Sequence, residues 1–150
     1  MRYGISGGPL PAGLPYGSEI TQACGTEFSP VLAYAIKQNE TGPNDPPDVL
    51  QIGGNGHGIF QLDSSYPTDW ADPLANATWA VEQFLLPAQE FWANEGLLGE
   101  ALIRAIAATF NAGLGAAQAG HSLGNVDLYT TDDYAARALA HYYALLGVPA

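Results

Sequence analysis

The sequence predicts a mostly α-helical domain with a small irregular β element, and three observations support this. Hydrophobic residues make up 47% of the 150 residues and charged residues only 13%, which is typical of a folded globule. Several segments repeat apolar residues at the helical period of about 3.6. Glycine and proline gather in two stretches outside these segments, residues 1–17 and 41–58, where irregular backbone is expected.

The chain begins with a stretch that is poor in helix-forming residues. Residues 1–17 hold five glycines and three prolines, which indicates irregular backbone. We expect a Gly/Pro-rich arm over residues 1–27, packed on one domain that covers residues 28–150.

The first helix is predicted over Pro30–Glu40. Ser29 is a good N-cap, proline suits the first helical position, and Gly42 suits the helix end. Leu32, Ile36 and Glu40 lie four residues apart and share one face. Glu40 therefore continues an apolar stripe, and contact with apolar side chains raises the pKa of a carboxyl group. Such a group can donate a proton near neutral pH.

A long loop over residues 41–58 is rich in glycine and proline, and loops of this length are usually functional or disordered. Short strands are expected on either side of its last glycines, over 49–52 and 58–62.

The other predicted helices follow the loop. Asp72 and the proline after it begin a long helix that Gly96 ends, with a kink or break at Pro87. Further helices are expected over 99–110, 114–119 and 131–146. Thr131 is the expected cap of the last helix.

The charge excludes some partners. The formal net charge is −11, and Lys plus Arg number only four. Nucleic acids and anionic membranes bind basic surfaces, so we expect neither as a partner. No apolar run is long enough for a membrane span, and the N-terminus has no secretory signal segment. Cys24 is the only cysteine, and no Cys/His metal spacing occurs. We therefore expect a monomer with no metal or cofactor.

Four short segments together resemble a known family. They are Asn39-Glu40-Thr41-Gly42, the run Gly56-His57-Gly58-Ile59-Phe60-Gln61-Leu62-Asp63, the run Ala108-Thr109-Phe110-Asn111-Ala112-Gly113, and Thr130-Thr131-Asp132-Asp133-Tyr134-Ala135. In this order and spacing the chain resembles the goose-type lysozymes and the soluble lytic transglycosylase domains over about residues 28–146. Phe60 stands where that family has Met, and Phe110 where it has Tyr.

The resemblance implies an α+β lysozyme-like fold with its β element at the substrate cleft. It also implies a peptidoglycan-degrading muramidase, which cleaves the β-1,4 bond between N-acetylmuramic acid and N-acetylglucosamine. Glu40 would be the general acid that protonates the glycosidic oxygen.

The second carboxylate decides the reaction. Asp63 is the candidate base that positions water in a hydrolase, and a turn or cap role before Ser64 and Ser65 is the alternative. The family pattern places another Asp where this chain has Ile52, so Asp45 or Asp48 would have to replace it. Without such carboxylates, a lytic transglycosylase forms 1,6-anhydro-muramic ends.

Six residues are the expected substrate binders. Gln61 and Asn111 offer amides that match acetamido and hydroxyl groups, although Asn111 would also suit a helix C-cap. Gly58 would let the backbone approach the glycan. Phe60 and Phe110 are expected to shape the floor of the cleft. Tyr134 is expected to hydrogen-bond the Glu40 carboxyl or to line the cleft. His57 is interpreted as a rim or loop residue.

The substrate class and the setting stay open. The same motifs fit chitin oligosaccharides, and a catalytically weak glycan-binding module is a further possibility. A phage endolysin, a virion-associated lysin and an exported bacterial enzyme are all compatible with the sequence.

Overall fold

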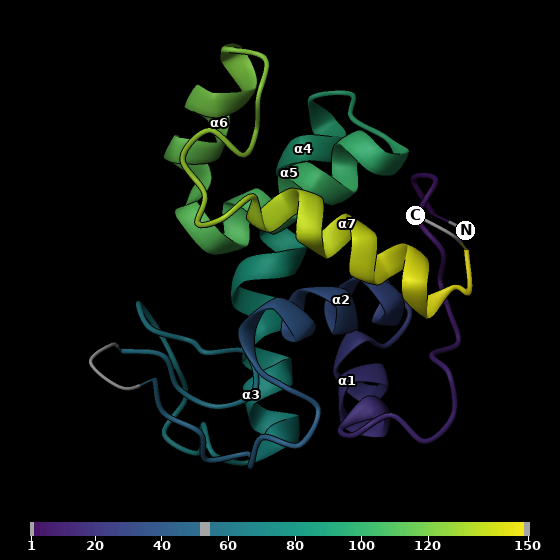
Figure 1. The fold of residues 1–150 in the computed structure, drawn as a ribbon, viewed down its shortest axis with the longest axis vertical. Coiled ribbons are helices and arrows are strands. Elements are labelled where there is room, and N and C mark those ends of the chain that lie inside the picture. Colours follow the sequence, from purple (N-terminus) through teal and green to yellow (C-terminus); the bar gives the residue numbers. More distant parts are fainter. Residues whose placement is uncertain (1, 52–54, 149–150) are drawn as a thin grey trace.

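The computed structural model describes residues 2–51 and 55–148, and Figure 1 shows their arrangement. The prediction of a mostly α-helical chain is confirmed. The elements in chain order are α1 (Gly17–Cys24), α2 (Pro30–Glu40), α3 (Pro73–Ala80), the π-helix η1 (Val81–Leu85), α4 (Leu86–Asn94), α5 (Gly99–Ala112), α6 (Leu114–Ser122) and α7 (Tyr134–Leu145).

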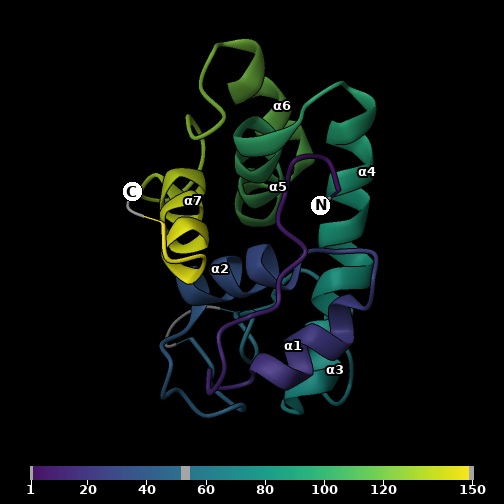
Figure 2. The same cartoon turned by 90° about the vertical axis from the view of Figure 1, so that its right-hand side faces the viewer.

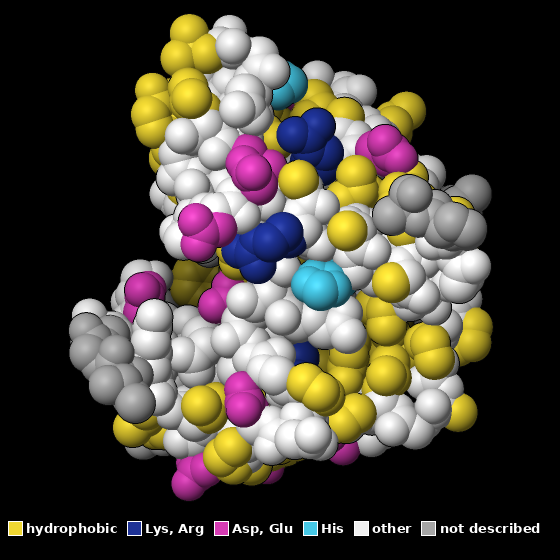
Figure 3. All heavy atoms as spheres, viewed as in Figure 1, with side chains coloured by type: hydrophobic (Ala, Val, Ile, Leu, Met, Phe, Trp, Pro, Cys, Tyr) yellow, Lys and Arg dark blue, Asp and Glu magenta, His cyan; other side chains and the backbone are white. Residues whose placement is uncertain are grey.

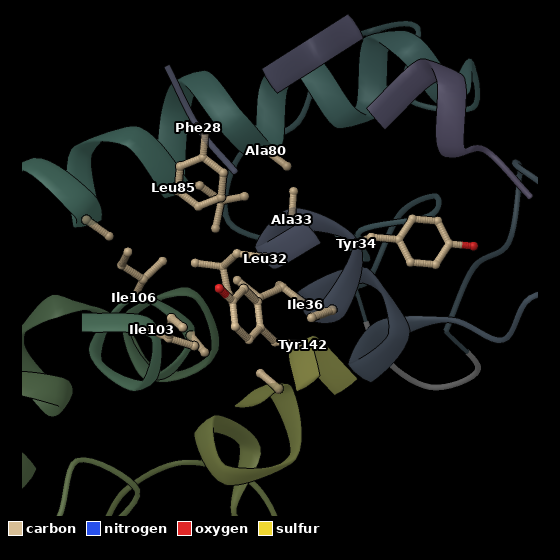
Figure 4. Packing of buried hydrophobic residues seen from close by; sticks show 14 of the residues in the cluster. Phe28, Leu32, Ala33, Tyr34, Ile36, Ala80, Leu85, Ile103, Ile106 and Tyr142 are labelled. Atoms are coloured by element: carbon tan, nitrogen blue, oxygen red, sulfur yellow. The ribbon is translucent and has the colours of Figure 1, made fainter. Parts of the chain in front are cut away.

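Helix α2 runs through the middle of the fold. Its first eight residues, Pro30–Lys37, are all buried. It packs against α1 and α7, and α7 also packs against α5. Leu32 and Ile36 lie in a cluster with side chains of η1, α5 and α7 (Figure 4). Burial of one such side chain stabilises the fold by about 2 kcal/mol.

The start of α2 is as predicted, but its end is not. The Ser29 hydroxyl accepts a hydrogen bond from the Leu32 amide at 3.1 Å, and proline follows the cap. At the other end the capping residue is Thr41 in extended backbone, not a left-handed Gly42. The Thr41 hydroxyl donates to the Ile59 carbonyl at 2.9 Å, which directs the chain toward the loop. Glu40 is therefore the last helical residue.

The long helix expected after Asp72 is divided by a π-helical turn. The Asp72 carboxylate accepts from the Ala75 amide at 2.9 Å, which confirms the predicted cap. The π-helix η1 then separates α3 from α4, and these run one after the other along one side of the molecule (Figure 2). Pro87 has no amide to donate to the preceding turn, and the wider π turn accommodates it. The predicted kink or break thus takes the form of η1.

Helices α5 and α6 are near their expected ranges, whereas α7 begins later than predicted. Asp132 and Asp133 have φ angles of 50° and 54°, so they lie outside the helix, and Thr131 does not cap it. Asp127, which precedes the helix by seven residues, caps the first turn of α7 instead. Its carboxylate oxygens accept from the amides of Ala135 at 2.7 Å and Ala136 at 3.0 Å. The sequence prediction failed because this cap is not adjacent to the helix.

The N-terminal segment contains a helix that composition did not reveal. Helix α1 buries Ile20 and Cys24 and packs against α3, so residues 17–24 of the predicted arm of 1–27 are not irregular. The residues before it lie on the domain surface. The Gly99 amide donates to the Tyr3 carbonyl at 2.8 Å, and the Ser6 amide donates to the Tyr142 hydroxyl at 2.7 Å.

The predicted short strands are not formed as strands in the described residues. Single antiparallel bridges join Leu50 to His57 and His57 to Leu62. Residues 58–61 form a turn instead, with Gly58 and Gln61 at positive φ. Ile52 lies outside the described residues.

Two further findings concern residues 2–51 and 55–148. No helix in these ranges is long and apolar enough to cross a membrane. No group of three or more His, Cys, Asp and Glu side chains there is arranged to hold a metal ion.

Candidate functional site

A cleft of about 460 Å³ lies where α2 ends and α7 begins. Its volume falls in the range of about 300–1,000 Å³ that is usual for ligand sites. Figure 3 shows a hollow on the left of the molecule, with acidic side chains on both sides. The cleft lining is mostly polar and comes from six segments: Asn39, Glu40, Gln51, Gln61, Leu62, Asp63, Ser64, Phe84, Phe110, Asn111, Thr131, Tyr134 and Arg137.

Glu40 reaches this cleft from the C-terminal end of α2. Burial raises the pKa of its carboxyl from 4.5 to about 7, and the nearby charge of Asp63 acts in the same direction. The Tyr134 hydroxyl and the Arg137 charge lower the pKa, but by less than burial raises it. Leu32 and Ile36 on the same face of α2 are fully buried, whereas Glu40 itself is half-buried beside polar groups of Tyr134, Arg137 and Asp63. A substantial fraction of Glu40 is therefore protonated at neutral pH.

Tyr134 is the first residue of α7 and is buried beside Glu40. Its hydroxyl donates a hydrogen bond to Glu40 Oε2. The expected contact of Tyr134 with the acid is thus present. Its backbone carbonyl also accepts from Asn39 Nδ2 at 2.9 Å. Two adjacent residues of α2 are therefore joined to one residue of α7.

Asp63 is exposed and lines the same cleft as Glu40. Asp45 does not line it. The Asp45 carboxylate accepts from the Gly42 amide at 2.7 Å and interacts electrostatically with the buried Lys37. Asp48 is exposed and is absent from the cleft lining. The proposed replacement of the missing aspartate by Asp45 or Asp48 is therefore wrong in this structure.

Two phenylalanines line the cleft, and a third packs behind them. Phe84 and Phe110 line the cleft, with their ring centroids 6.0 Å apart in an edge-to-face arrangement. Phe60 is fully buried and lies behind Phe110, at 6.2 Å between ring centroids. The prediction that Phe60 forms the floor is wrong, since Phe60 supports Phe110 without lining the cleft.

Gln61 and Asn111 line the cleft, but part of each amide group binds the protein. Gln61 Nε2 donates to the carbonyl oxygens of Gly58 at 2.8 Å and Val49 at 3.2 Å. Asn111 Oδ1 accepts from the Thr131 amide at 2.9 Å. Asn111 lies inside α5 and does not cap it, because the capping residue is Gly113. The Asn111 NH₂ group is the amide donor that these bonds leave for a ligand.

Gly58 does not line the cleft. A Cβ atom at this position would lie 2.2 Å from Asn76 Nδ2 and 2.8 Å from the Trp70 carbonyl. Its φ of +74° also favours glycine. The predicted approach of a glycan to Gly58 is therefore wrong, and the glycine is needed for packing against α3. His57, next to it, stacks on Tyr66 with ring centroids 3.9 Å apart and is also outside the cleft lining.

Sequence reasoning missed Arg137 and Asn39. Arg137 lines the cleft one helical turn after Tyr134, and Asn39 directly precedes Glu40. For Arg137 the signal was usable, because residues three apart on a helix share a face, whereas Asn39 is adjacent to Glu40 and spacing alone does not place it in the cleft.

Comparison of the chain with protein-family models, curated proteins and solved structures finds no match. The chemical capacity of the site follows from its geometry alone. It combines a half-buried acid of raised pKa, an exposed carboxylate and an aromatic wall in one polar cleft. This set can donate a proton to a leaving oxygen and bind a polar polymer beside it.

Proposed function

We propose that this chain is a peptidoglycan-degrading muramidase that cleaves the β-1,4 bond between N-acetylmuramic acid and N-acetylglucosamine. The observation that carries the proposal is the Glu40 carboxyl, whose pKa burial raises to about 7 inside a polar cleft. A glycosidic oxygen is a poor leaving group until it is protonated. Glu40 supplies this proton as the general acid.

Asp63 is the proposed water-positioning base. Its carboxylate lies in the same cleft, and its charge reaches Glu40. In an inverting hydrolase the base removes a proton from water as the water attacks the anomeric carbon. Bond cleavage then consumes one water and leaves a reducing end.

The cleft offers surfaces that suit amino sugars. Phe110 and Phe84 provide apolar faces for pyranose rings, and the Asn111 amide provides a donor for acetamido or hydroxyl oxygens. We also propose that the fold is lysozyme-like. Its β element at the cleft, which the motifs imply, is part of the same proposal.

A lytic transglycosylase is the second candidate. One observation favours it: Asp45 and Asp48 do not line the cleft, so Asp63 is the single carboxylate beside Glu40 among the described lining residues. In that reaction the 6-hydroxyl of the muramoyl residue attacks its own anomeric carbon. The glycosidic bond breaks without water, and a 1,6-anhydro ring forms.

Mass analysis of purified peptidoglycan after digestion tests the proposal. A hydrolase leaves reducing-end muropeptides, each one water heavier than the anhydro form. Anhydro products alone would replace the hydrolase with the transglycosylase. The matched control is Glu40→Gln, which keeps the shape of the side chain but has no acidic proton to transfer to the glycosidic oxygen. If the wild type releases no muropeptides, or the control releases as many, the assignment of Glu40 as the acid fails. A non-catalytic glycan-binding module then becomes the better interpretation.

A further inference from the structure

Arg137 is the one Lys or Arg side chain among the described residues that line the cleft. The chain has only four such residues. Of the other three, Lys37 is buried in α2, Arg104 lies 3.9 Å from Asp127, and Arg2 is exposed near the N-terminus. A positive charge in this cleft is therefore a specific feature of an otherwise acidic chain.

The guanidinium of Arg137 is held in place by three acceptors. Nε donates to the Asp132 carbonyl at 2.8 Å and Nη2 to the Thr131 carbonyl at 3.3 Å. Nη1 donates to Asn39 Oδ1 at 3.3 Å. A guanidinium has five N–H donors, so these bonds leave one on each terminal nitrogen. The two terminal nitrogens together match the two oxygens of a carboxylate.

Among residues 2–51 and 55–148 the charge of Arg137 has no carboxylate partner, and its guanidinium lies over the Tyr134 ring at 5.6 Å from the centroid. All three acceptors are neutral, and the described residues place no carboxylate oxygen within ion-pair distance of it. The side chain is exposed, while Asn39 and Thr131, which hold it, also line the cleft. The guanidinium is thus fixed in advance, which reduces the entropy that a ligand must overcome on binding.

Electrostatics indicate what this group is for. An anionic ligand that enters the cleft meets the carboxyl groups of Glu40 and Asp63 on a chain of net charge −11. A neutral sugar polymer does not need a cation there, but an anionic one does. Chitin is uncharged, whereas a muramoyl residue of peptidoglycan carries a carboxylate on its stem peptide or, without a peptide, on its lactyl group.

We propose that Arg137 binds a carboxylate carried by the muramoyl residue and thereby makes the site prefer peptidoglycan to chitin. The carboxylate belongs to the stem peptide or, where no peptide is attached, to the lactyl group. This inference rests on the proposed muramidase function and names the substrate feature that the cleft recognises.

Three substrates distinguish the sources of the carboxylate: peptidoglycan with its stem peptides, glycan strands from which an amidase has removed the peptides, and chitohexaose. The variants are Arg137→Gln and Arg137→Lys, with Arg2→Gln as the control that removes one positive charge far from the cleft. Circular dichroism checks that each variant is folded. Binding is measured by calorimetry in the Glu40→Gln background, and kcat/KM in the active protein.

Arg137→Gln should weaken binding and lower kcat/KM for the muramoyl substrates by about 10-fold to 100-fold, the usual effect of losing a hydrogen-bonded charge. Chitohexaose should change by less than about 3-fold, and Arg2→Gln should behave as wild type. Arg137→Lys should recover part of the loss, because it keeps the charge without the paired donors. With the stem peptide attached, the lactyl carboxyl is an amide, so an effect only on that substrate assigns a carboxylate of the peptide. An effect only on the peptide-free strands assigns the lactyl carboxylate that the amidase frees, and an effect on both shows that Arg137 binds either one.

An equal loss on chitohexaose and on both muramoyl substrates would overturn the inference. Arg137 would then act only on Glu40 or on the residues that hold it, which affects every substrate alike. This outcome differs from failure of the proposed function, in which the wild type cleaves and binds none of the three substrates.

Discussion

The hydroxyl of Tyr134 donates a hydrogen bond to Oε2 of Glu40, although the two residues lie 94 positions apart in the chain. The bond fixes which carboxyl oxygen remains free. Because Oε2 accepts from Tyr134, the transferable proton of Glu40 belongs on Oε1. The bond also stabilises the ionised form of Glu40 and so opposes the effect of burial.

Tyr134→Phe should therefore raise the pKa of Glu40 above its value of about 7. The phenyl ring keeps the packing, and only the hydroxyl that stabilises the carboxylate is lost. The pKa is measured directly by NMR of isotope-labelled glutamate carboxyl groups, with Glu40→Gln to assign the signal. In an active enzyme the alkaline limb of the pH–rate profile should move upward with it, since the acid works only when protonated.

Asp63→Asn should shift the same pKa in the opposite direction. The negative charge of Asp63 disfavours ionisation of Glu40, so its removal lowers the Glu40 pKa. The NMR measurement does not depend on activity, which this substitution should reduce severely in a hydrolase. A Glu40 pKa that moves the same way in both variants would contradict the electrostatic description of the cleft.

Glu40→Gln should make the protein more stable at pH 8 while removing activity. The folded-state pKa of Glu40 is raised, so its contribution to stability is fully present below pH 4.5 and is lost as the pH rises to about 7. Above that range the variant should gain at most about 3 kcal/mol in the free energy of unfolding. Urea unfolding at pH 4 and pH 8 measures this, with Glu90→Gln on the exposed face of α4 as control. A gain that is equal at both pH values would show that burial of the charge is not its cause.

The sequence predicted those parts of the fold that depend on local signals. Ser29 and Asp72 cap the helices that they precede, and Pro87 coincides with a break in a helix. Helix α7 was placed too early because its amides bind Asp127, whose distance in sequence hides the cap. Helix α1 was missed because the glycines and prolines before it indicate irregular backbone and no side chain caps its first turn.

The site was predictable to a similar extent. Glu40, Asp63 and Tyr134 lie together as expected, because each belongs to a short motif whose spacing is informative. Arg137 belongs to no such motif, and its role depends on acceptors from two other segments. Gly58 was assigned to the ligand because a glycine in a loop does not reveal whether a ligand or the protein occupies the space beside it.

Gly58→Ala should destabilise the fold by more than about 2 kcal/mol. The new methyl group would overlap Asn76 Nδ2, and that amide donates to the His57 and Trp70 carbonyls at 3.0 Å each. Gly13→Ala is a matched control, since Gly13 has a φ of +81° with no atom near a Cβ atom. The control isolates backbone strain of about 1 kcal/mol. Equal melting temperatures for the two variants would mean that the contact with Asn76 does not matter.

Asp45→Asn should destabilise the protein through the buried Lys37. The Lys37 ammonium donates to the Gly42 carbonyl at 3.2 Å and lies between the rings of Tyr16 and Tyr34, at 5.6 and 5.5 Å from their centroids. Burial lowers the pKa of Lys37, and the Asp45 charge partly offsets this. Loss of that charge leaves a buried cation without its counter-charge, which should cost about 1–3 kcal/mol at pH 7.

Lys37→Met should remove this sensitivity to Asp45. Methionine fills a similar volume without charge, so the single variant should stay within about 1 kcal/mol of wild type, and Lys37→Met should rescue Asp45→Asn. The folded-state pKa of Lys37 lies below the ordinary 10.5, so the unfavourable charge is present at neutral pH and disappears as the pH rises toward that value. The deficit of Asp45→Asn relative to wild type should shrink accordingly between pH 7 and pH 10 in urea unfolding. Asp48→Asn removes an equal charge from an exposed neighbour and should show neither effect. If Asp45→Asn still lowers the free energy of unfolding in the Lys37→Met background, Asp45 stabilises the fold only through its hydrogen bond from the Gly42 amide.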